Sequence, residues 1–173
     1  MEEKASGHYV TKVTARKNPL EKERNIMDKI KIFTIGFTKK TAEKFFNILI
    51  GAGVKRVIDI RLNNVSQLAG FAKREDLRYF LRAIGGIDYI HLQDLAPTQQ
   101  IMDIFKKNNG SWADYERDFI ALLSGRKVET KLTTELLHRA CLLCSEEKPT
   151  QCHRRLVAEY LRTKWGNVEI IHL

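Results

Sequence analysis

Two of the chain's three cysteines lie close together near its carboxyl end, in the segment CSEEKPTQCHRR at residues 144–155. The second cysteine is followed directly by a histidine and two arginines. Thiols and an imidazole can hold zinc, a thiol beside basic groups can act as a nucleophile, and the start of a helix can bind an anion. These kinds of chemistry need different spacings, so the sequence favours some of them over others.

A zinc site would take its ligands from a small set, namely Cys144, Cys152 and His153, with Asp59 or Glu146 as the fourth. The seven residues between the two cysteines do not form the short C-x2-C of a zinc knuckle, and the sequence has no second cysteine pair. The adjacent Cys152 and His153 are also awkward ligands for one tetrahedral ion. A metal site, with zinc as the cofactor, is therefore the alternative interpretation, and the main one has no metal.

Cys152 is predicted to be a nucleophile or a redox-sensitive thiol. A helix is predicted to open at Pro149-Thr150, which puts Cys152 in its first turn beside basic residues, where the pKa of a thiol falls. The phosphatase-type loop needs an arginine six residues after the cysteine. The residues at that distance here are a threonine and an alanine, which excludes this mechanism in its usual form.

An anion site is the third interpretation of this segment. Free backbone N–H groups at a helix start, together with the guanidinium of Arg154, suit a phosphate or a carboxylate. The formal net charge of +9 also favours anionic partners such as a nucleotide or a nucleic acid. A solvated basic surface would explain the same charge, because the basic residues are spread along the chain.

The rest of the chain alternates short apolar runs with amphipathic segments. KIKIFTIG at 29–36 and RVIDIRL at 56–62 are typical of buried strands, and a helix capped by Thr38 or Thr41 separates them, as in a β-α-β unit. Further strands are predicted at 87–92, 140–144 and 168–173, with helices at 74–85, 99–124 (broken near 108–110), from Thr133 or Thr134, and 149–166. This order predicts an α/β fold, with a mostly parallel sheet of about five strands and helices on both faces.

The predicted organisation is a basic, loosely ordered arm over residues 1–28 and a single α/β domain over residues 29–173. The absence of long apolar runs excludes a transmembrane helix, and we expect no membrane partner. The polar N-terminus without a signal-peptide core predicts a cytoplasmic protein. The odd number of cysteines argues against a disulfide framework, and the P-loop, G-x-G-x-x-G and H-E-x-x-H motifs are missing.

Ligands of parallel α/β sheets bind beyond the carboxyl ends of the strands, and the unusual polar residues of this chain are predicted to gather there. The predicted catalytic residues are Asp59 and Glu146 for acid–base work and Cys152 as the nucleophile. The predicted substrate-binding residues are Thr34, Gly36, Arg61, Ser66, His153 and Arg154. A structural ion pair is the alternative for Asp59 and Arg61, because a buried charge needs a partner.

These residues resemble one family. TIG at 34–36, DIR at 59–61, Ser66, GIDYIHL at 86–92 and above all LCSEEKPTQCHR at 143–154 are similar to the family catalogued as domain of unknown function 488, over roughly residues 31–173. After the third strand the family often has a leucine-glycine-glycine run, whereas this chain has DLAPT at 94–98. The resemblance implies an α/β domain with an unassigned polar cluster at Thr34, Gly36, Asp59, Arg61, Ser66, Cys144, Glu146, Cys152, His153 and Arg154.

The sequence thus predicts an enzyme-like α/β protein that binds an anionic substrate, a nucleotide or a nucleic acid, at the rim formed by the strand ends. The competing hypothesis is a non-catalytic protein that binds a metal or responds to oxidation, and that binds nucleic acid or regulates another process.

Overall fold

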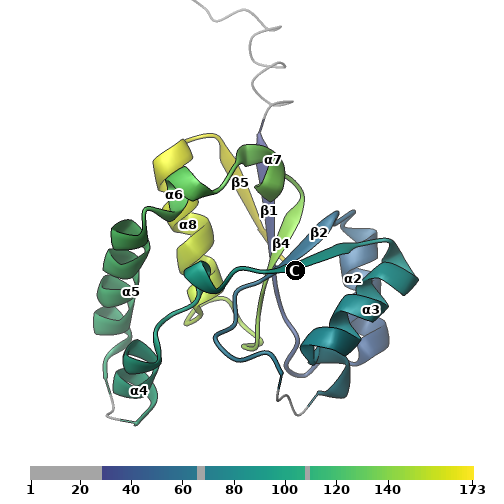
Figure 1. Ribbon diagram of the computed structural model, residues 1–173, viewed down its shortest axis with the longest axis horizontal. Helices are drawn as coiled ribbons and strands as arrows, with labels where there is room; N and C mark the ends of the chain where they lie inside the picture. The colour runs from purple at the N-terminus through teal and green to yellow at the C-terminus, as the bar shows by residue number, and fades with distance from the viewer. Residues whose placement is uncertain (1–28, 66–68, 108–109) are drawn as a thin grey trace, which may run out of the picture.

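The computed structural model describes residues 29–65, 69–107 and 110–173; the predicted arm over residues 1–28 and the predicted site residue Ser66 lie outside this part of the chain. The described residues form a five-stranded sheet in the order β3-β2-β4-β1-β5 (Figure 1). Its strands are β1 (Ile30–Gly36), β2 (Arg56–Asp59), β3 (Asp88–His91), β4 (Ala140–Cys144) and β5 (Val168–His172). All four pairings are parallel, which confirms the predicted α/β sheet.

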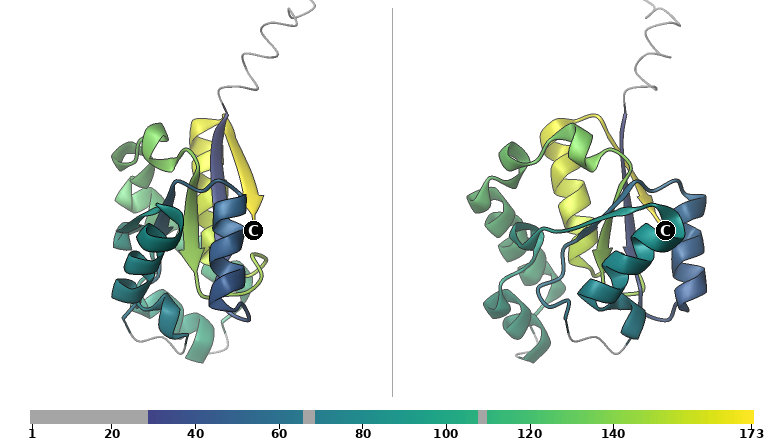
Figure 2. Two further views of the ribbon diagram at one scale, coloured as in Figure 1. Left: turned by 90° about the vertical axis from the view of Figure 1, so that its right-hand side faces the viewer. Right: turned by 45° about the vertical axis from the view of Figure 1, so that its right-hand side comes forward.

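Helices cover both faces of the sheet, as predicted. Helices α2 (Ala42–Gly51) and α3 (Arg74–Gly85) lie together on one side, and α5 (Trp112–Arg126) and α8 (His153–Trp165) lie on the other (Figures 1 and 2). The shorter elements are α4 (Gln99–Lys107), α6 (Val128–Lys131), α7 (Thr134–Leu137) and two 3-10 turns, Gly70–Ala72 and Gln93–Leu95. None of the helices in the described ranges combines the length and the apolar character that crossing a bilayer requires.

The core has two layers because side chains alternate between the two faces of each strand. Ile32 of β1 packs in the layer beneath α5 and α8, and its neighbour Phe33 packs in the layer beneath α2 and α3. In β4, Leu142 and Leu143 divide between the layers in the same way. Burial on both faces explains why these strands are continuous apolar runs in the sequence.

Two predicted boundaries are wrong. Strand β2 ends at Asp59 and does not continue to residue 62, because the Arg61 side chain turns back to bind the Asp59 carboxylate. Helix α8 begins at His153 with Cys152 as its N-cap residue, and does not begin at Pro149-Thr150. The segment before it is a loop, since the Arg154 guanidinium binds carbonyl oxygens within that segment.

Candidate functional site

The site lies where the chain leaves two neighbouring strands in opposite directions. Strands β2 and β4 are paired, but β2 leads to α3 on one face of the sheet and β4 leads to α8 on the other. Such a divergence leaves a crevice beyond the strand ends, which is where ligands bind in open α/β sheets. A pocket of about 200 Å³ occupies this position, and its wall includes Asn63, Lys106, Cys144, Glu146 and His153.

A larger pocket of about 530 Å³ lies at the opposite, amino-terminal ends of the strands. It is lined by the first residues of the strands, including Ile30, Arg56 and Asp88, and by His138. Its lysines and arginine are accompanied by two acidic residues, Asp88 and Glu135, and the cysteines are at the other end of the strands. The smaller pocket is therefore the one that is associated with the thiols.

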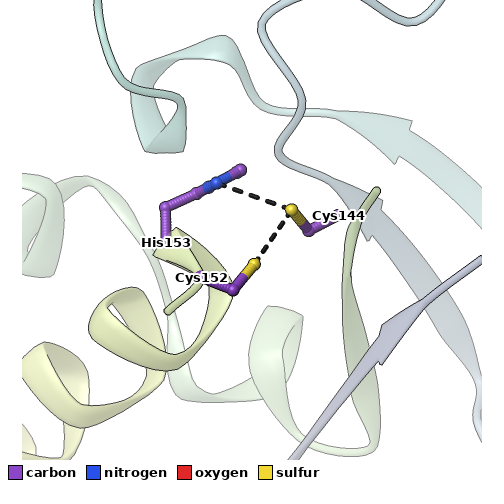
Figure 3. Close-up of side chains that lie close together, drawn as sticks. All are labelled: Cys144, Cys152 and His153. Carbon is purple, nitrogen blue, oxygen red and sulfur yellow. Dashed lines mark hydrogen bonds between the residues drawn. The ribbon is translucent and has the colours of Figure 1, made fainter. Parts of the chain in front are cut away.

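Three side chains meet beside the smaller pocket, and we call Cys144, Cys152 and His153 the thiol cluster (Figure 3). Cys144 and His153 form part of the pocket wall. Cys144 is the last residue of β4, Cys152 caps α8 and His153 is the first residue of α8. Cys144 Sγ lies 3.0 Å from Cys152 Sγ and 3.5 Å from His153 Nδ1. The turn into α8 thus brings both of its first side chains to the thiol at the end of β4.

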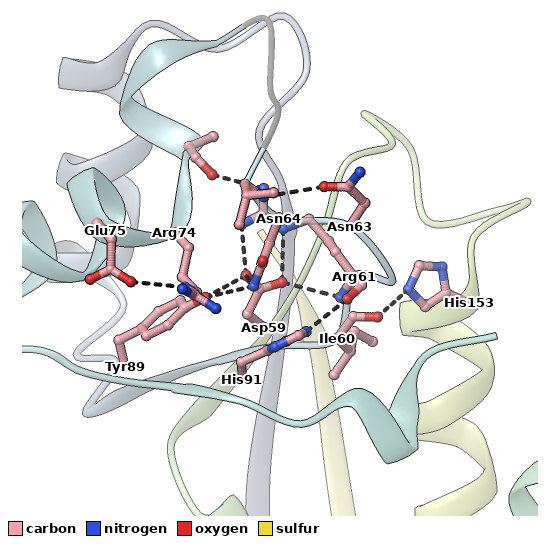
Figure 4. Close-up of polar contacts among 12 residues, drawn as sticks. Asp59, Ile60, Arg61, Asn63, Asn64, Arg74, Glu75, Tyr89, His91 and His153 are labelled. Carbon is pink, nitrogen blue, oxygen red and sulfur yellow. Dashed lines mark hydrogen bonds and ion pairs between the residues drawn. The ribbon is translucent and has the colours of Figure 1, made fainter. Parts of the chain in front are cut away.

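The backbone decides which nitrogen of His153 faces the thiol. His153 Nε2 lies 2.9 Å from the carbonyl oxygen of Ile60, at the end of β2 (Figure 4). A carbonyl oxygen can only accept a hydrogen bond, so Nε2 carries the proton and donates it. In the neutral ring Nδ1 then has a lone pair directed at Cys144, and it can accept a proton from that thiol.

The two cysteines of the cluster have opposite pKa shifts. Burial raises the pKa of Cys144, but the hydrogen bonds from Cys152 and the Glu146 backbone N–H, with the charge of Arg154, outweigh burial and hold this pKa below its ordinary value. The hydrogen bond that Cys152 donates to Cys144, together with burial, raises the pKa of Cys152. Cys144 is thus the more acidic thiol. Burial raises the pKa of Cys141, in the middle of β4.

Arg154 is a buried cation next to the thiol cluster. Its Nη1 donates to the Glu146 carbonyl at 2.7 Å and lies 3.1 Å from Cys152 Sγ, and its Nη2 donates to the Glu147 carbonyl at 3.0 Å. Only 1% of the residue is exposed. Arg154 therefore holds the loop before α8 and puts a positive charge beside a sulfur, and it does not reach the pocket wall, which is formed by other described residues.

Two predicted binding residues at the end of β1 have structural contacts. Thr34 is fully buried, and its hydroxyl lies 2.7 Å from Nδ1 of His172. Gly36 lies against the loop after β4, and a Cβ there would collide with the Glu146 carbonyl oxygen. The absence of a side chain at Gly36 thus lets that carbonyl reach Arg154.

The second buried polar group is the ion pair of Asp59 and Arg61 with Asn64 and Tyr89, which we call the Asp59 brace (Figure 4). Arg61 binds the carboxylate through Nε at 2.8 Å and Nη2 at 2.6 Å, and its Nη1 donates to the Ala72 carbonyl at 2.9 Å. Tyr89 Oη donates to the carboxylate at 2.7 Å, and Asn64 Nδ2 donates at 3.2 Å. These contacts favour the structural interpretation of the ion pair.

The brace also sets the charge of Asp59. Burial raises the pKa of this carboxyl, but the hydrogen bonds and charge of Arg61 and the hydrogen bond from Tyr89 outweigh burial and bring the pKa below its ordinary value of 3.8. Burial and the neighbouring Asp59 raise the pKa of Tyr89. Asp59 is therefore a carboxylate with its oxygens engaged. Glu146, the other predicted acid–base residue, has an exposed side chain and lines the pocket.

Cys144, Cys152 and His153 are the described residues that could hold a metal ion, since their ligand atoms all lie within 4.8 Å of one another. A ring nitrogen that binds a metal usually has its partner nitrogen hydrogen-bonded, as Nε2 of His153 is. Two features fit a metal less well. Zn–S bonds of about 2.3 Å separate tetrahedral sulfurs by roughly 3.8 Å, whereas these sulfurs lie 3.0 Å apart. The Arg154 charge also lies against Cys152.

The sequence did not reveal the roles of three contributors to the site. Cys144 was expected at the strand ends, but the only chemical role predicted for it was that of a metal ligand. Tyr89 lies in the strand predicted at 87–92 but was not connected with Asp59. The Ile60 carbonyl has no side-chain signal in the sequence at all.

Comparisons with known proteins gave one match. The family model described as domain of unknown function DUF488 matches residues 41–161. No curated protein and no solved structure matched the chain.

Proposed function

The chain belongs to the DUF488 family, and from the geometry of its site we propose that it is an enzyme in which Cys144 is the nucleophile and His153 the general base. The observation that carries this proposal is the 3.5 Å contact between Cys144 Sγ and His153 Nδ1 at the wall of a pocket. A nucleophile and a base in contact, with the base oriented by a third group, is the arrangement of thiol enzymes. The third group here is the Ile60 carbonyl.

Cys144 replaces Cys152, the residue predicted from the sequence, as the proposed nucleophile. Cys144 lines the pocket, whereas Cys152 is outside the set of described residues that form its wall. In this proposal His153 Nδ1 takes the Cys144 proton when the thiol attacks, and it returns the proton to the leaving group. Cys152 donates a hydrogen bond to the Cys144 sulfur and so stabilises its thiolate.

The proposed substrate is a small molecule with an anionic group. A pocket of about 200 Å³ is smaller than most drug-sized ligand sites, and Lys106 contributes a positive charge to its wall. Arg61 also lines the pocket, but its guanidinium is bound to Asp59. The net charge of +9 supports an anionic partner, and the terminal phosphate of a nucleotide is the corresponding candidate.

The test is the rate at which a small electrophile modifies Cys144. Iodoacetamide should alkylate Cys144 of the wild type, measured by peptide mass spectrometry, and His153→Gln should slow the reaction roughly 100-fold, as the loss of a general base does. His138→Gln is the matched control, because His138 lies at the opposite ends of the strands. Equal alkylation rates in wild type and His153→Gln would overturn the role of His153.

A zinc enzyme is the second candidate, supported by three ligand atoms that lie within 4.8 Å of one another and by the anchored His153 ring. Three protein ligands with an open position toward a pocket are typical of catalytic zinc. Protein purified without chelators would then contain one zinc per chain, and Cys144→Ser would lose it. That result would replace the nucleophile proposal, whereas metal-free protein with an alkylated Cys144 would remove the zinc candidate.

A further inference from the structure

We propose that this site reduces small hydroperoxides through a pair of thiols, in which Cys144 attacks the peroxide and Cys152 resolves the product. The inference rests on the proposed nucleophilic role of Cys144. It replaces the anionic substrate proposed above with a hydroperoxide and gives the second cysteine a task. It is drawn from the contact of the two sulfurs, from their burial and from the position of Arg154.

The first observation is the contact of the two sulfurs. Cys144 Sγ and Cys152 Sγ are 3.0 Å apart although both residues are reduced. A disulfide bond is about 2.05 Å long, so bond formation requires the sulfurs to approach by only about 1 Å. Cys152 caps a helix and follows a loop, so its side chain is attached where the backbone can adjust without a break in the sheet.

The burial of Cys144 limits which oxidants can reach its sulfur. Only 2% of Cys144 is exposed, and it is reached through the 200 Å³ pocket, so a disulfide on the surface of another protein could not approach its sulfur. A hydroperoxide needs only its O–O bond beside the thiolate, and hydrogen peroxide is among the smallest oxidants. The same limits favour a compact organic hydroperoxide over a bulky one.

The chemistry balances with the groups that are present. The Cys144 thiolate attacks one peroxide oxygen, an S–O bond forms, the O–O bond breaks, and the leaving alkoxide takes the proton held by His153. Cys152 then attacks the sulfenic sulfur of Cys144 as a thiolate, an S–S bond forms, the S–O bond breaks, and the leaving hydroxide takes the proton that Cys152 lost and departs as water. The sum is two thiols and one hydroperoxide converted to one disulfide, one alcohol and one water. A small dithiol reductant closes the cycle by thiol–disulfide exchange.

Arg154 is positioned to assist the second step. Its Nη1 is 3.1 Å from Cys152 Sγ, and its Nε is a buried nitrogen that has no hydrogen-bond partner among the described residues. A thiolate is the attacking species in thiol chemistry, and a cation stabilises it. Arg154 would thus stabilise the sulfur of Cys152 when it loses its proton, after Cys144 has been oxidised.

The test oxidises the reduced full-length protein with hydrogen peroxide and locates the products by peptide mass spectrometry. Wild type should form the Cys144–Cys152 disulfide, and Cys152→Ser should give a Cys144 sulfenic acid that dimedone traps. Cys141→Ser is the matched control and should behave as wild type, because Cys141 lies within β4 away from the pocket wall. Wild type should also consume peroxide continuously with dithiothreitol, and Cys144→Ser should not.

The outcomes separate this inference from the proposed function. Rapid, His153-dependent alkylation of Cys144 without any peroxide-induced disulfide would overturn the inference and leave the nucleophile in place. A disulfide that forms without peroxide turnover above that of Cys144→Ser would also overturn the activity. A Cys144 that neither alkylates nor oxidises would remove both proposals. Thermal unfolding of each variant shows whether a lost signal reflects a lost fold.

Discussion

Two buried polar groups lie side by side at the ends of β2 and β4, and they differ in how completely their atoms are bonded. In the Asp59 brace, both carboxylate oxygens accept hydrogen bonds from the backbone or side chains of Arg61, Asn64 and Tyr89. In the thiol cluster, Cys144 and His153 make a contact of 3.5 Å, and the neighbouring Arg154 Nε has no partner among the described residues. The hydrogen bonds of the Asp59 brace are complete, whereas the thiol cluster can still transfer a proton or form a new bond.

The contrast between the two groups shows that burial and unusual polarity do not by themselves identify a catalytic site. A saturated buried ion pair is stable because each charge has a partner, and this leaves little capacity for a substrate. A pair of thiols tolerates looser contacts, since a sulfur is a weak hydrogen-bond partner and costs less to bury. The brace should therefore control stability, and the thiol cluster should control reactivity.

Breaking the brace should give the largest loss of stability. Asp59→Asn removes a buried charge and leaves the Arg61 guanidinium without its counter-ion, so we expect a loss of about 3–5 kcal/mol in the free energy of unfolding. Urea denaturation measures it. Asp88→Asn is the control, because the Asp88 side chain is 69% exposed in its pair with Arg56 and should cost less than about 1 kcal/mol. Similar losses in the two variants would contradict the distinction.

Removing one hydroxyl from the brace should have an intermediate effect. Tyr89→Phe deletes a hydrogen bond to a charged carboxylate, and about 1.5–3 kcal/mol of stability should be lost at neutral pH. This hydrogen bond helps to hold the Asp59 pKa below 3.8, so its contribution is present above that value and disappears as pH falls through the folded-state pKa. The stability curves of wild type and Tyr89→Phe should therefore converge in acid. Parallel curves would argue against a charged Asp59.

The smallest effect on stability should come from the thiol cluster. The serine hydroxyl of Cys144→Ser is smaller than the thiol and costs more to bury, but it can donate a hydrogen bond to His153 Nδ1 that offsets this cost, so the free energy of unfolding should change by no more than about 1 kcal/mol. The Cys144→Ser variant should nevertheless no longer react with iodoacetamide at residue 144. Chemical denaturation and peptide mass spectrometry on one preparation check both statements. A loss as large as that of Asp59→Asn would assign the cluster a structural role.

Much of the fold could be predicted because its signals are local. The short, continuous apolar runs that became β1, β4 and β5 have the length of buried strands, and the helical period of apolar residues in α3 predicts an amphipathic helix. The start of α8 could not be placed in this way. Pro149 and Thr150 have the chemistry of a helix start, but the contacts of Arg154 with the loop carbonyls decide the boundary, and those depend on the folded chain.

The candidate site was predictable as a place and less so as a mechanism. The strand-end rule brought Cys144, Cys152 and His153 to one rim, and the cluster of the three confirms that proximity. The same rule gave Asp59 and Arg61 a predicted chemical role, because a sequence does not show whether two charges will satisfy each other. The partner of Asp59 that decides this, Tyr89, comes from another strand.

The hydrogen bond from His153 to the Ile60 carbonyl has a consequence for genetics and for engineering. The group that orients the imidazole is a main-chain atom, held in place by the N–H of Ile60 bonded to the Leu143 carbonyl at 3.2 Å. Any residue at position 60 that preserves the fold supplies the same oxygen, so scanning mutagenesis of side chains would pass over it. The position of the proton on the His153 ring thus depends on how the chain after β2 is aligned with β4. Chains that share this alignment would favour the same tautomer even where their side chains differ.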